Sequence, residues 1–293
     1  MDYPRISLVT GCYNHEKYIG ETIESVVSQG YPNLQYVVIN DGSTDRSEKI
    51  IKKYARYLDH WETLSGYRNN IVPAINRGFS YTNGEIMGWL NSKNILFPKS
   101  LFTIAQIFRE LPKVNWLTGL AANIDDQGRI LTVNSYKKNV YDYLSGDWPV
   151  IQQESTFWRR PLWKKTGAHL VNRWAFDLEL WTRFFLRAKL YHVNTALGAY
   201  RLIPEALSIK NKAKYRLLAE KGLDEMRERS SKKLIARARI YHFGKKYLYP
   251  ILGMIPGKVL NRFFPYYAYR TISYSFTREK WEIGKENPFR KNL

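Results

Sequence analysis

Apolar and polar positions alternate along the first half of the chain with two different periods. Short apolar runs bounded by polar loops are typical of buried strands, and apolar residues at every third or fourth position are typical of helices. Strands that alternate with helices favour a parallel, doubly wound α/β sheet. The pattern predicts strands at 6–10, 34–40, 85–90 and near 115–121, and helices at 16–29, 47–58, 74–84 and about 98–110.

Polar loops follow three of these predicted strands. They cover residues 11–15, 41–45 and 91–94, and each comes directly after an apolar run. In doubly wound sheets, ligands bind beyond the carboxyl ends of the strands. We therefore expect the three loops to lie together and to form a ligand site.

The pattern changes after about residue 205. Residues 206–243 predict one or two long, charged helices, and the apolar stretches of 245–270 are short and interrupted by Pro250, Pro256 and Pro265. Such stretches are too short to cross a membrane and suit segments that lie in its interface. We expect two regions, an α/β domain over 1–204 and a basic, aromatic, helical extension over 205–293.

The net charge is +20 and is unevenly distributed. Residues 205–293 hold 21 Lys and Arg against 8 Asp and Glu, and residues 229–278 hold eleven Lys and Arg and no acid. Such a segment binds polyanions, either an anionic membrane surface or a nucleic acid. Because the chain has no recognisable nucleic-acid module, we expect a membrane surface and no nucleic acid.

Other features of the composition concern the compartment. The apolar content of 44% argues against disorder. Cys12 is the one cysteine, so no intramolecular disulfide can form, which suits a reducing compartment. The first residues show no basic-then-apolar leader. We expect a cytoplasmic protein that binds peripherally to the inner face of the membrane, in an oligomeric state that the sequence does not define.

Two aspartates and one longer stretch of the sequence have both a candidate chemical role and a simpler structural interpretation. Asp41 follows a predicted strand, where a carboxylate can accept a hydrogen bond from a base or a ribose hydroxyl. Asp177 points away from an apolar helical face, and it is either functional or a solvent-facing acid that the helix dipole stabilises. In 151–167, the structural interpretation is a strand and a helix with Trp158 buried and Arg159 and Arg160 exposed.

Together these stretches resemble one family. SLVTGCYNHEKYIGETIESVVSQGYPNLQYVVINDGSTD, AINRGFSYTNGEIMGWLNSKN, QQESTFWRRPLW and FDLELWTRF occur in the order found in family 2 glycosyltransferases. The resemblance covers roughly residues 5–202. It implies a GT-A fold, with a Rossmann-like, nucleotide-sugar-binding mixed sheet flanked by helices. It also implies inverting transfer of a sugar, UDP-linked, to a hydroxyl of a saccharide or lipid-linked acceptor during bacterial cell-surface polysaccharide or glycolipid synthesis.

The resemblance also assigns roles to individual residues. It implies that Asp177 is the catalytic base and that Asp41 binds the uracil or the ribose. The loop 91–94 matches the family's metal loop, commonly Asn-Ser-Asp-Asp. The remaining matches are Thr10, Tyr13 and Asn14 in the first nucleotide-binding loop, and Trp158, Arg159 and Arg160 on the acceptor side.

The sequence departs from the family pattern at three places. Lys93 and Asn94 replace the two metal-loop acids, no acid lies between Glu62 and Glu85, and Ile203 stands where many relatives have a histidine. The loop can offer Mn²⁺ or Mg²⁺ at most a weak site through Asn91 and Asn94, because it lacks carboxylate ligands.

The departures leave two hypotheses open. In the first, Lys93 supplies the positive charge that a metal gives in relatives, together with Arg68, and binds the diphosphate beside Asn91. In the second, donor binding has been lost, and the chain is a non-catalytic scaffold or regulatory subunit of a glycosyltransferase complex.

Overall fold

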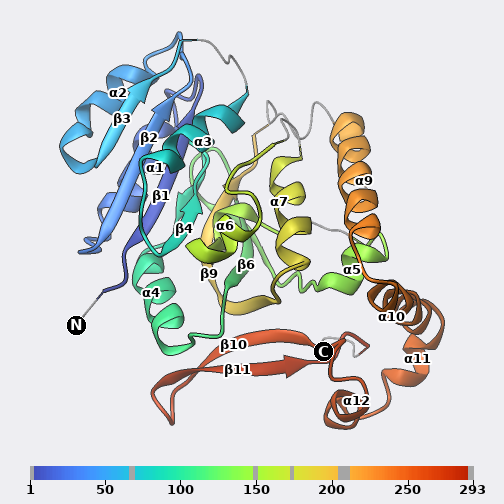
Figure 1. The fold of residues 1–293 in the computed structure, drawn as a ribbon. Coiled ribbons are helices and arrows are strands. Elements are labelled where there is room, and N and C mark those ends of the chain that lie inside the picture. Colours follow the sequence, from blue (N-terminus) through green and yellow to red (C-terminus); the bar gives the residue numbers. More distant parts are fainter. Residues whose placement is uncertain (1–2, 66–69, 148–150, 172–174, 204–211, 290–293) are drawn as a thin grey trace.

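The computed structural model describes residues 3–65, 70–147, 151–171, 175–203 and 212–289. Its first half is a parallel sheet in the strand order β4-β1-β2-β3 (Figure 1). The predicted strands and helices of this half are confirmed, and β3 was not predicted. The elements are β1 (Ile6–Cys12), α1 (Ile19–Val27), β2 (Leu34–Asn40), α2 (Ser47–Lys53), a 3₁₀ turn (Ala55–Tyr57), β3 (His60–Thr63), α3 (Ile71–Ser80) and β4 (Ile86–Trp89).

The second half completes a mixed sheet of eleven strands, as the resemblance implies. β8 runs antiparallel to both of its neighbours, β4 and β6, while β6 and β9 are parallel. Helices cover the faces of the sheet (Figure 1). The elements are β5 (Ile95–Leu96), α4 (Ser100–Glu110), β6 (Trp116–Ile124), β7 (Ile130–Asn134), α5 (Val140–Leu144), a 3₁₀ turn (Gln153–Ser155), β8 (Thr156–Arg159), α6 (Arg160–Lys165), α7 (Phe176–Phe185) and β9 (Leu190–Arg201).

Successive residues of the central strands belong to two hydrophobic cores, because side chains alternate between the faces of a sheet. Val9 packs with one core and Leu8 with the other. The first core is rich in tryptophan: the Trp181 ring stacks on Trp89 at 5.8 Å and on Trp116 at 5.6 Å, and Trp158 packs edge-on against Trp89. This aromatic layer fixes α7 against β4, β6 and β8.

The C-terminal extension is helical as predicted, and then it returns to the sheet (Figure 1). Its helices are followed by a β10–β11 hairpin that was not predicted, and β10 pairs in parallel with β9. The elements are α9 (Lys212–Glu228), α10 (Lys232–Phe243), a π-helical turn (Gly244–Leu248), α11 (Tyr249–Leu252), α12 (Gly257–Phe263), β10 (Tyr269–Ser275) and β11 (Lys280–Glu286).

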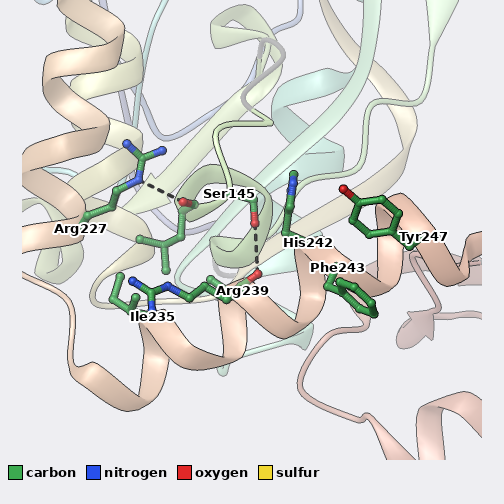
Figure 2. Close-up of a pocket in the computed structure, with 9 residues that line it drawn as sticks. Ser145, Arg227, Ile235, Arg239, His242, Phe243 and Tyr247 are labelled. Atoms are coloured by element: carbon green, nitrogen blue, oxygen red, sulfur yellow. Dashed lines mark hydrogen bonds between the residues drawn. The ribbon is translucent and has the colours of Figure 1, made fainter.

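The extension and the α/β domain share one hydrophobic core, which contains Leu223, Met226 and Tyr241 beside Trp181. The boundary at 204 therefore separates two patterns in the sequence but not two independent cores. A pocket of about 680 Å³ opens where α5 meets α9 and α10, and Figure 2 shows Arg227, Arg239 and His242 along it.

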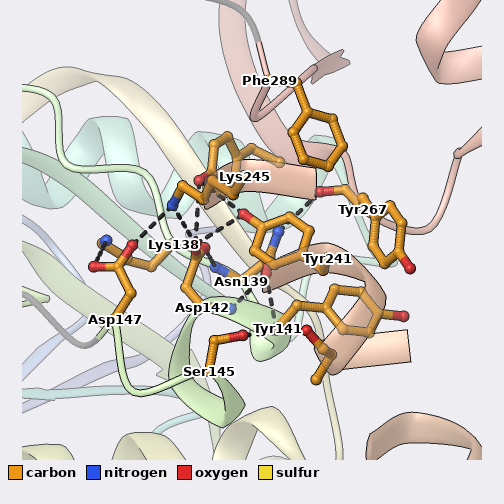
Figure 3. Close-up of polar contacts among 12 residues, drawn as sticks. Lys138, Asn139, Tyr141, Asp142, Ser145, Asp147, Tyr241, Lys245, Tyr267 and Phe289 are labelled. Carbon is orange, nitrogen blue, oxygen red and sulfur yellow. Dashed lines mark hydrogen bonds and ion pairs between the residues drawn. The ribbon is translucent and has the colours of Figure 1, made fainter. Parts of the chain in front are cut away.

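A buried polar network also joins the two regions (Figure 3). Asp142 of α5 is fully buried and accepts hydrogen bonds from Tyr241 at 2.8 Å and from the Lys245 ammonium at 2.7 Å. Lys245 also contacts Asp147 at 2.8 Å, and Asp147 accepts a hydrogen bond from Lys138 at 3.0 Å. The charges on both sides are thus neutralised within the protein.

We expect Lys245→Met to lower the free energy of unfolding by about 2–4 kcal/mol, because it leaves the buried Asp142 carboxylate without its cation. Urea denaturation at pH 7 measures the change. Lys246→Met is the matched control, because Lys246 is exposed, and a shift of less than about 0.5 kcal/mol is expected for it. Equal stability of the Lys245→Met protein and the wild type would show that the network does not hold the extension in place.

Candidate functional site

The three predicted loops lie together at the carboxyl ends of β1, β2 and β4. The backbone N–H of Asn14 donates to Ser43 Oγ at 3.0 Å, and Asn14 Oδ1 accepts from the backbone N–H of Thr44 at 2.8 Å. Asn14 has a φ of 51°, a left-handed conformation that asparagine tolerates better than most residues. His15 Nδ1 shares a hydrogen bond of 2.7 Å with Ser92 Oγ, so it ties the first loop to the third.

Within the first loop, the structure separates the three predicted nucleotide-binding residues. Asn14 is exposed and Tyr13 is half-buried, so both can meet a ligand. Thr10 is fully buried, and its hydroxyl shares a hydrogen bond of 2.9 Å with Tyr36 in the core. The Thr10 side chain therefore has a structural role in the core. All residues of β1 are buried, and the chain reaches the surface only after the strand, at Tyr13 and Asn14.

Asp41 lies at the end of β2 with an exposed fraction of 0%. Neither of its carboxylate oxygens has a hydrogen-bond partner in the described part of the chain. Burial raises the pKa of the Asp41 carboxyl to about 6, and the backbone N–H of Asn70, which lies close enough to favour the ionised form but not in hydrogen-bonding geometry, opposes the rise only in part. Unsatisfied buried carboxylates are costly, so Asp41 is a candidate to accept a hydrogen bond from a bound molecule that reaches the end of β2.

Arg201 of β9 anchors the loop 91–94 through two hydrogen bonds. This fully buried guanidinium donates from Nε to the Lys93 carbonyl at 2.8 Å, and the Arg201 backbone N–H donates to Asn94 Oδ1 at 3.0 Å. The Lys93 ammonium lies 3.3 Å from the Tyr200 hydroxyl and 4.6 Å from the centre of that ring. Lys93 is thus held beside an aromatic ring, at the position where the family resemblance implies a metal-loop acid.

Glu154 is a functional candidate that the sequence interpretation missed. It is 3% exposed, and its Oε1 accepts hydrogen bonds from Asn94 and, at 3.5 Å, from Asn91. Burial and the negative charge of Asp177 raise the pKa of the Glu154 carboxyl to about 7, and the Lys93 ammonium opposes this rise. The loop 91–94 is therefore organised around a carboxylate that comes from another segment.

Asp177 lies in the first turn of α7, near Glu154. Its Oδ1 accepts hydrogen bonds from the backbone N–H of Leu178 at 2.8 Å and from the Tyr215 hydroxyl of α9 at 3.4 Å. Burial raises the pKa of the Asp177 carboxyl above its usual value. Asp177 is therefore not a freely solvated helix-start acid, and the extension contributes to its surroundings through Tyr215.

The structure does not bring the WRR end of the QQESTFWRR stretch to this site, which corrects the acceptor-side prediction. Trp158 is buried in the aromatic core. Arg159 donates to the carbonyl of Val114, and Arg160 donates to the carbonyl of Gly84, just before the amino ends of β6 and β4 and therefore at the opposite ends of these strands. The reason is strand direction: β8 is antiparallel to β4, so its first end, with Glu154, meets the carboxyl end of β4.

Arg68, the second predicted cation, lies outside the described residues. Ile203 is buried and offers no ligand atom from its side chain. Within the described ranges, no group of three or more His, Cys, Asp and Glu side chains is arranged to hold a metal ion. Asn94 already uses its amide oxygen on Arg201, and Lys93 brings a positive charge into the loop. The described residues of the loop 91–94 and its surroundings do not fit a divalent cation.

Comparison with known proteins identifies the family. The model of "Glycosyl transferase family 2" matches residues 7–203. The chain belongs to glycosyltransferase family 2. Among its relatives are EpsE of Bacillus subtilis, 31% identical over 100 residues, and the poly-beta-1,6-N-acetyl-D-glucosamine synthase of Staphylococcus epidermidis, 27% identical over 114 residues. The matches cover 33% and 39% of this chain but only 36% and 28% of those proteins.

Solved structures agree on the fold. S. aureus TarS 1–349 in complex with UDP-GlcNAc superposes with a TM-score of 0.65 at 17% identity, over 82% of this chain and 73% of that 1–349 chain. The mannosyltransferase PcManGT from Pyrobaculum calidifontis, in complex with GDP-Man and Mn²⁺, gives 0.58 at 16% identity, over 83% and 70% of the two chains. The GT-A fold predicted for this family 2 glycosyltransferase is confirmed. Among its described residues, no helix has the length and apolarity to cross a membrane.

Proposed function

We propose that this family 2 glycosyltransferase moves a sugar from a nucleoside diphosphate, UDP-linked, to an acceptor hydroxyl with inversion. The observation that carries the proposal is the grouping of Lys93, Glu154 and Asp177 where the carboxyl end of β4 meets the start of β8. Asp41 and the loop of Tyr13 and Asn14 lie at the neighbouring strand ends and would bind the nucleoside.

The chain's own residues can carry out the chemistry. The acceptor oxygen attacks the anomeric carbon from the side opposite the diphosphate, and its proton passes to the Asp177 carboxylate. The bond from the anomeric carbon to the diphosphate oxygen breaks, and its electron pair leaves with the diphosphate. The Lys93 ammonium stabilises the negative charge on that leaving group.

Glu154 is a positioning residue in this proposal. Through Asn91 and Asn94 it fixes the backbone of the loop that carries Lys93. Its raised pKa lets Glu154 carry a proton near neutral pH. A protonated Glu154 is neutral and does not repel the negatively charged diphosphate.

The cellular role rests on the relatives. The similarity to the poly-beta-1,6-N-acetyl-D-glucosamine synthase supports cell-surface polysaccharide or glycolipid synthesis, with a saccharide or lipid-linked acceptor. TarS binds UDP-GlcNAc, which supports a UDP-linked donor, whereas PcManGT binds GDP-Man on the same fold.

A panel of UDP- and GDP-sugars tests the function. Binding and hydrolysis of each are measured with excess EDTA and with Mn²⁺ or Mg²⁺. We expect a UDP-sugar to bind and to be hydrolysed slowly in EDTA. The replacement of both metal-loop acids by Lys93 and Asn94 favours a second candidate, a non-catalytic subunit of a transferase complex. Binding of no donor under any condition would favour that candidate.

We expect Asp41→Asn to weaken uridine binding by about 10-fold or more, because a neutral amide replaces a charged acceptor. For the wild type, uridine affinity should rise as pH increases through about 6, where Asp41 ionises. Calorimetry with uridine at pH 5 and pH 8 measures both effects. Unchanged affinity in the variant would remove Asp41 from the nucleoside site.

The same substitution separates function from stability. Burial raises the pKa of Asp41 in the folded protein to about 6, so the folded state favours the neutral carboxyl. The stability that comes from this preference is fully present below the unfolded pKa and is lost as pH rises through 6. Asp41→Asn should therefore raise the free energy of unfolding at pH 8 by about 1–3 kcal/mol, and by much less at pH 4.

A further inference from the structure

The helices α10 and α12 each bury one face, and α10, α11 and α12 all expose large apolar side chains to solvent. On α10 the buried face contains Ala238 and Tyr241, which pack into the shared core. On the outer side, large apolar side chains recur at helical spacing from α10 through α11 to the following turn. We name this row the outer stripe: Ile240, Phe243, Tyr247, Ile251 and Met254.

The outer stripe is strongly exposed. Ile240 is 60% exposed, Ile251 is 59% exposed and Met254 is 77% exposed. A second row of the same kind lies on and just after α12, where Phe263 is 67% exposed between Val259 and Tyr266. An apolar face of this extent on a soluble helix marks an interaction surface.

The charge around these two rows indicates the partner. Residues 229–278 contain no acid. Exposed basic side chains flank both rows: Lys232, Lys233, Arg239, Lys246, Lys258 and Arg262. Apolar side chains bordered by lysine and arginine are the pattern of helices that lie in the interface of an anionic bilayer. A protein partner for this surface would have to combine an apolar face with an acidic border.

The pocket described above lies at the edge of the outer stripe and fits the same partner (Figure 2). Phe243 and Tyr247 line it together with Arg227, Arg239 and His242. Arg239 makes no ion pair among the described residues. A pocket with cationic and aromatic walls can hold the phosphate of a lipid headgroup while the acyl chains remain in the bilayer.

We propose that the outer stripe and the α12 row form a docking face for an anionic lipid bilayer. The helices lie flat on the membrane, with their apolar rows below the headgroups and the flanking lysines and arginines at the phosphates. The inference is independent of the proposed sugar transfer, since no residue of the docking face belongs to the site at the strand ends.

Vesicle co-sedimentation of the full chain tests the proposal. The vesicles are phosphatidylcholine alone or phosphatidylcholine with phosphatidylglycerol. We expect binding to the anionic vesicles only, with weakening as salt increases. Ile240→Ser/Met254→Ser/Phe263→Ser should lower the partition coefficient at least about 10-fold. The matched control is Leu217→Ser/Phe276→Ser, which removes side chains 66% and 85% exposed elsewhere, and it should bind as the wild type does.

A site-specific probe gives a second readout. Because Cys12 is buried, a thiol-reactive fluorophore will label an introduced exposed cysteine selectively. The label on Met254→Cys should shift to shorter wavelength with anionic vesicles, and the label on Phe276→Cys should not.

Several results would overturn the proposal. One is that the wild-type protein does not bind anionic vesicles. Another is that the triple variant binds them as strongly as the wild type. The third is that the control variant loses as much vesicle binding as the triple variant. A dimer that the triple variant abolishes, without any vesicle binding, would instead identify the face as an interface between two copies of the chain.

Discussion

Asp177→Asn is expected to lower turnover by about 100-fold or more and to leave UDP affinity nearly unchanged. The substitution keeps the shape of the side chain and removes the group that accepts the acceptor's proton. The amide oxygen of the introduced asparagine can still accept from the Leu178 N–H and the Tyr215 hydroxyl, as the Asp177 carboxylate does now. The helix start should therefore survive, so a loss of turnover would report on the chemistry. Turnover is measured as sugar transfer per folded protein.

Glu179→Gln is the matched control, two residues further along α7. Glu179 pairs with Arg183 at 2.8 Å within the same helix, and this pair serves the helix and not the site. We expect a small loss of stability and nearly normal turnover per folded protein. Full activity of the Asp177→Asn protein would show that Asp177 is not the base.

The pH profile gives an independent readout of the same residue. Because burial raises the pKa of Asp177, the catalytically active carboxylate forms at higher pH than for an exposed aspartate. The rate should therefore increase with pH through that raised pKa. This acidic limb should be absent from the residual activity of the Asp177→Asn protein.

Lys93→Ala is expected to weaken UDP binding by about 10–100-fold and to leave uridine binding within a few-fold of the wild type. Among the described residues of the loop 91–94, Lys93 carries the positive charge that can contact the diphosphate of UDP. Uridine has no phosphate and therefore cannot make this contact. Calorimetry with the two ligands measures the difference directly.

Two further variants control the Lys93 result. Lys93→Arg keeps the charge and should retain most of the UDP affinity. Lys93→Asp/Asn94→Asp restores the acids of the family pattern and should make UDP binding dependent on Mn²⁺. Equal losses of UDP and uridine affinity in Lys93→Ala would indicate a damaged loop and not a lost diphosphate contact.

The sequence predicts much of the first half of the fold, because its strands are short apolar runs and its helices have clear apolar faces. The meeting of the loops at 11–15, 41–45 and 91–94 follows from strand direction in a parallel sheet, and it is confirmed. The hairpin of β10 and β11 could not be predicted in the same way. Its place in the sheet depends on pairing with β9, nearly eighty residues earlier, and its apolar alternation is weak.

The strand pattern predicts candidate site residues only where they follow a strand directly, whereas Asp177, on a helix, comes from the family resemblance. Asp41 and Lys93 belong to this class. Glu154 was missed, and Arg159 and Arg160 were misplaced, because the direction of β8 reverses which end of QQESTFWRR faces the site. Tyr215 was missed because α9 reaches Asp177 through packing between distant segments, for which a single sequence gives no signal. The roles of these residues in catalysis remain predictions.

Calorimetric titration of UDP into the wild-type protein in excess EDTA tests the central claim most directly, namely that Lys93 takes the place of a metal ion in donor binding. The account predicts saturable binding in EDTA, with an affinity that changes by less than about 3-fold when Mn²⁺ replaces the chelator. Binding that appears only after Mn²⁺ is added would contradict it.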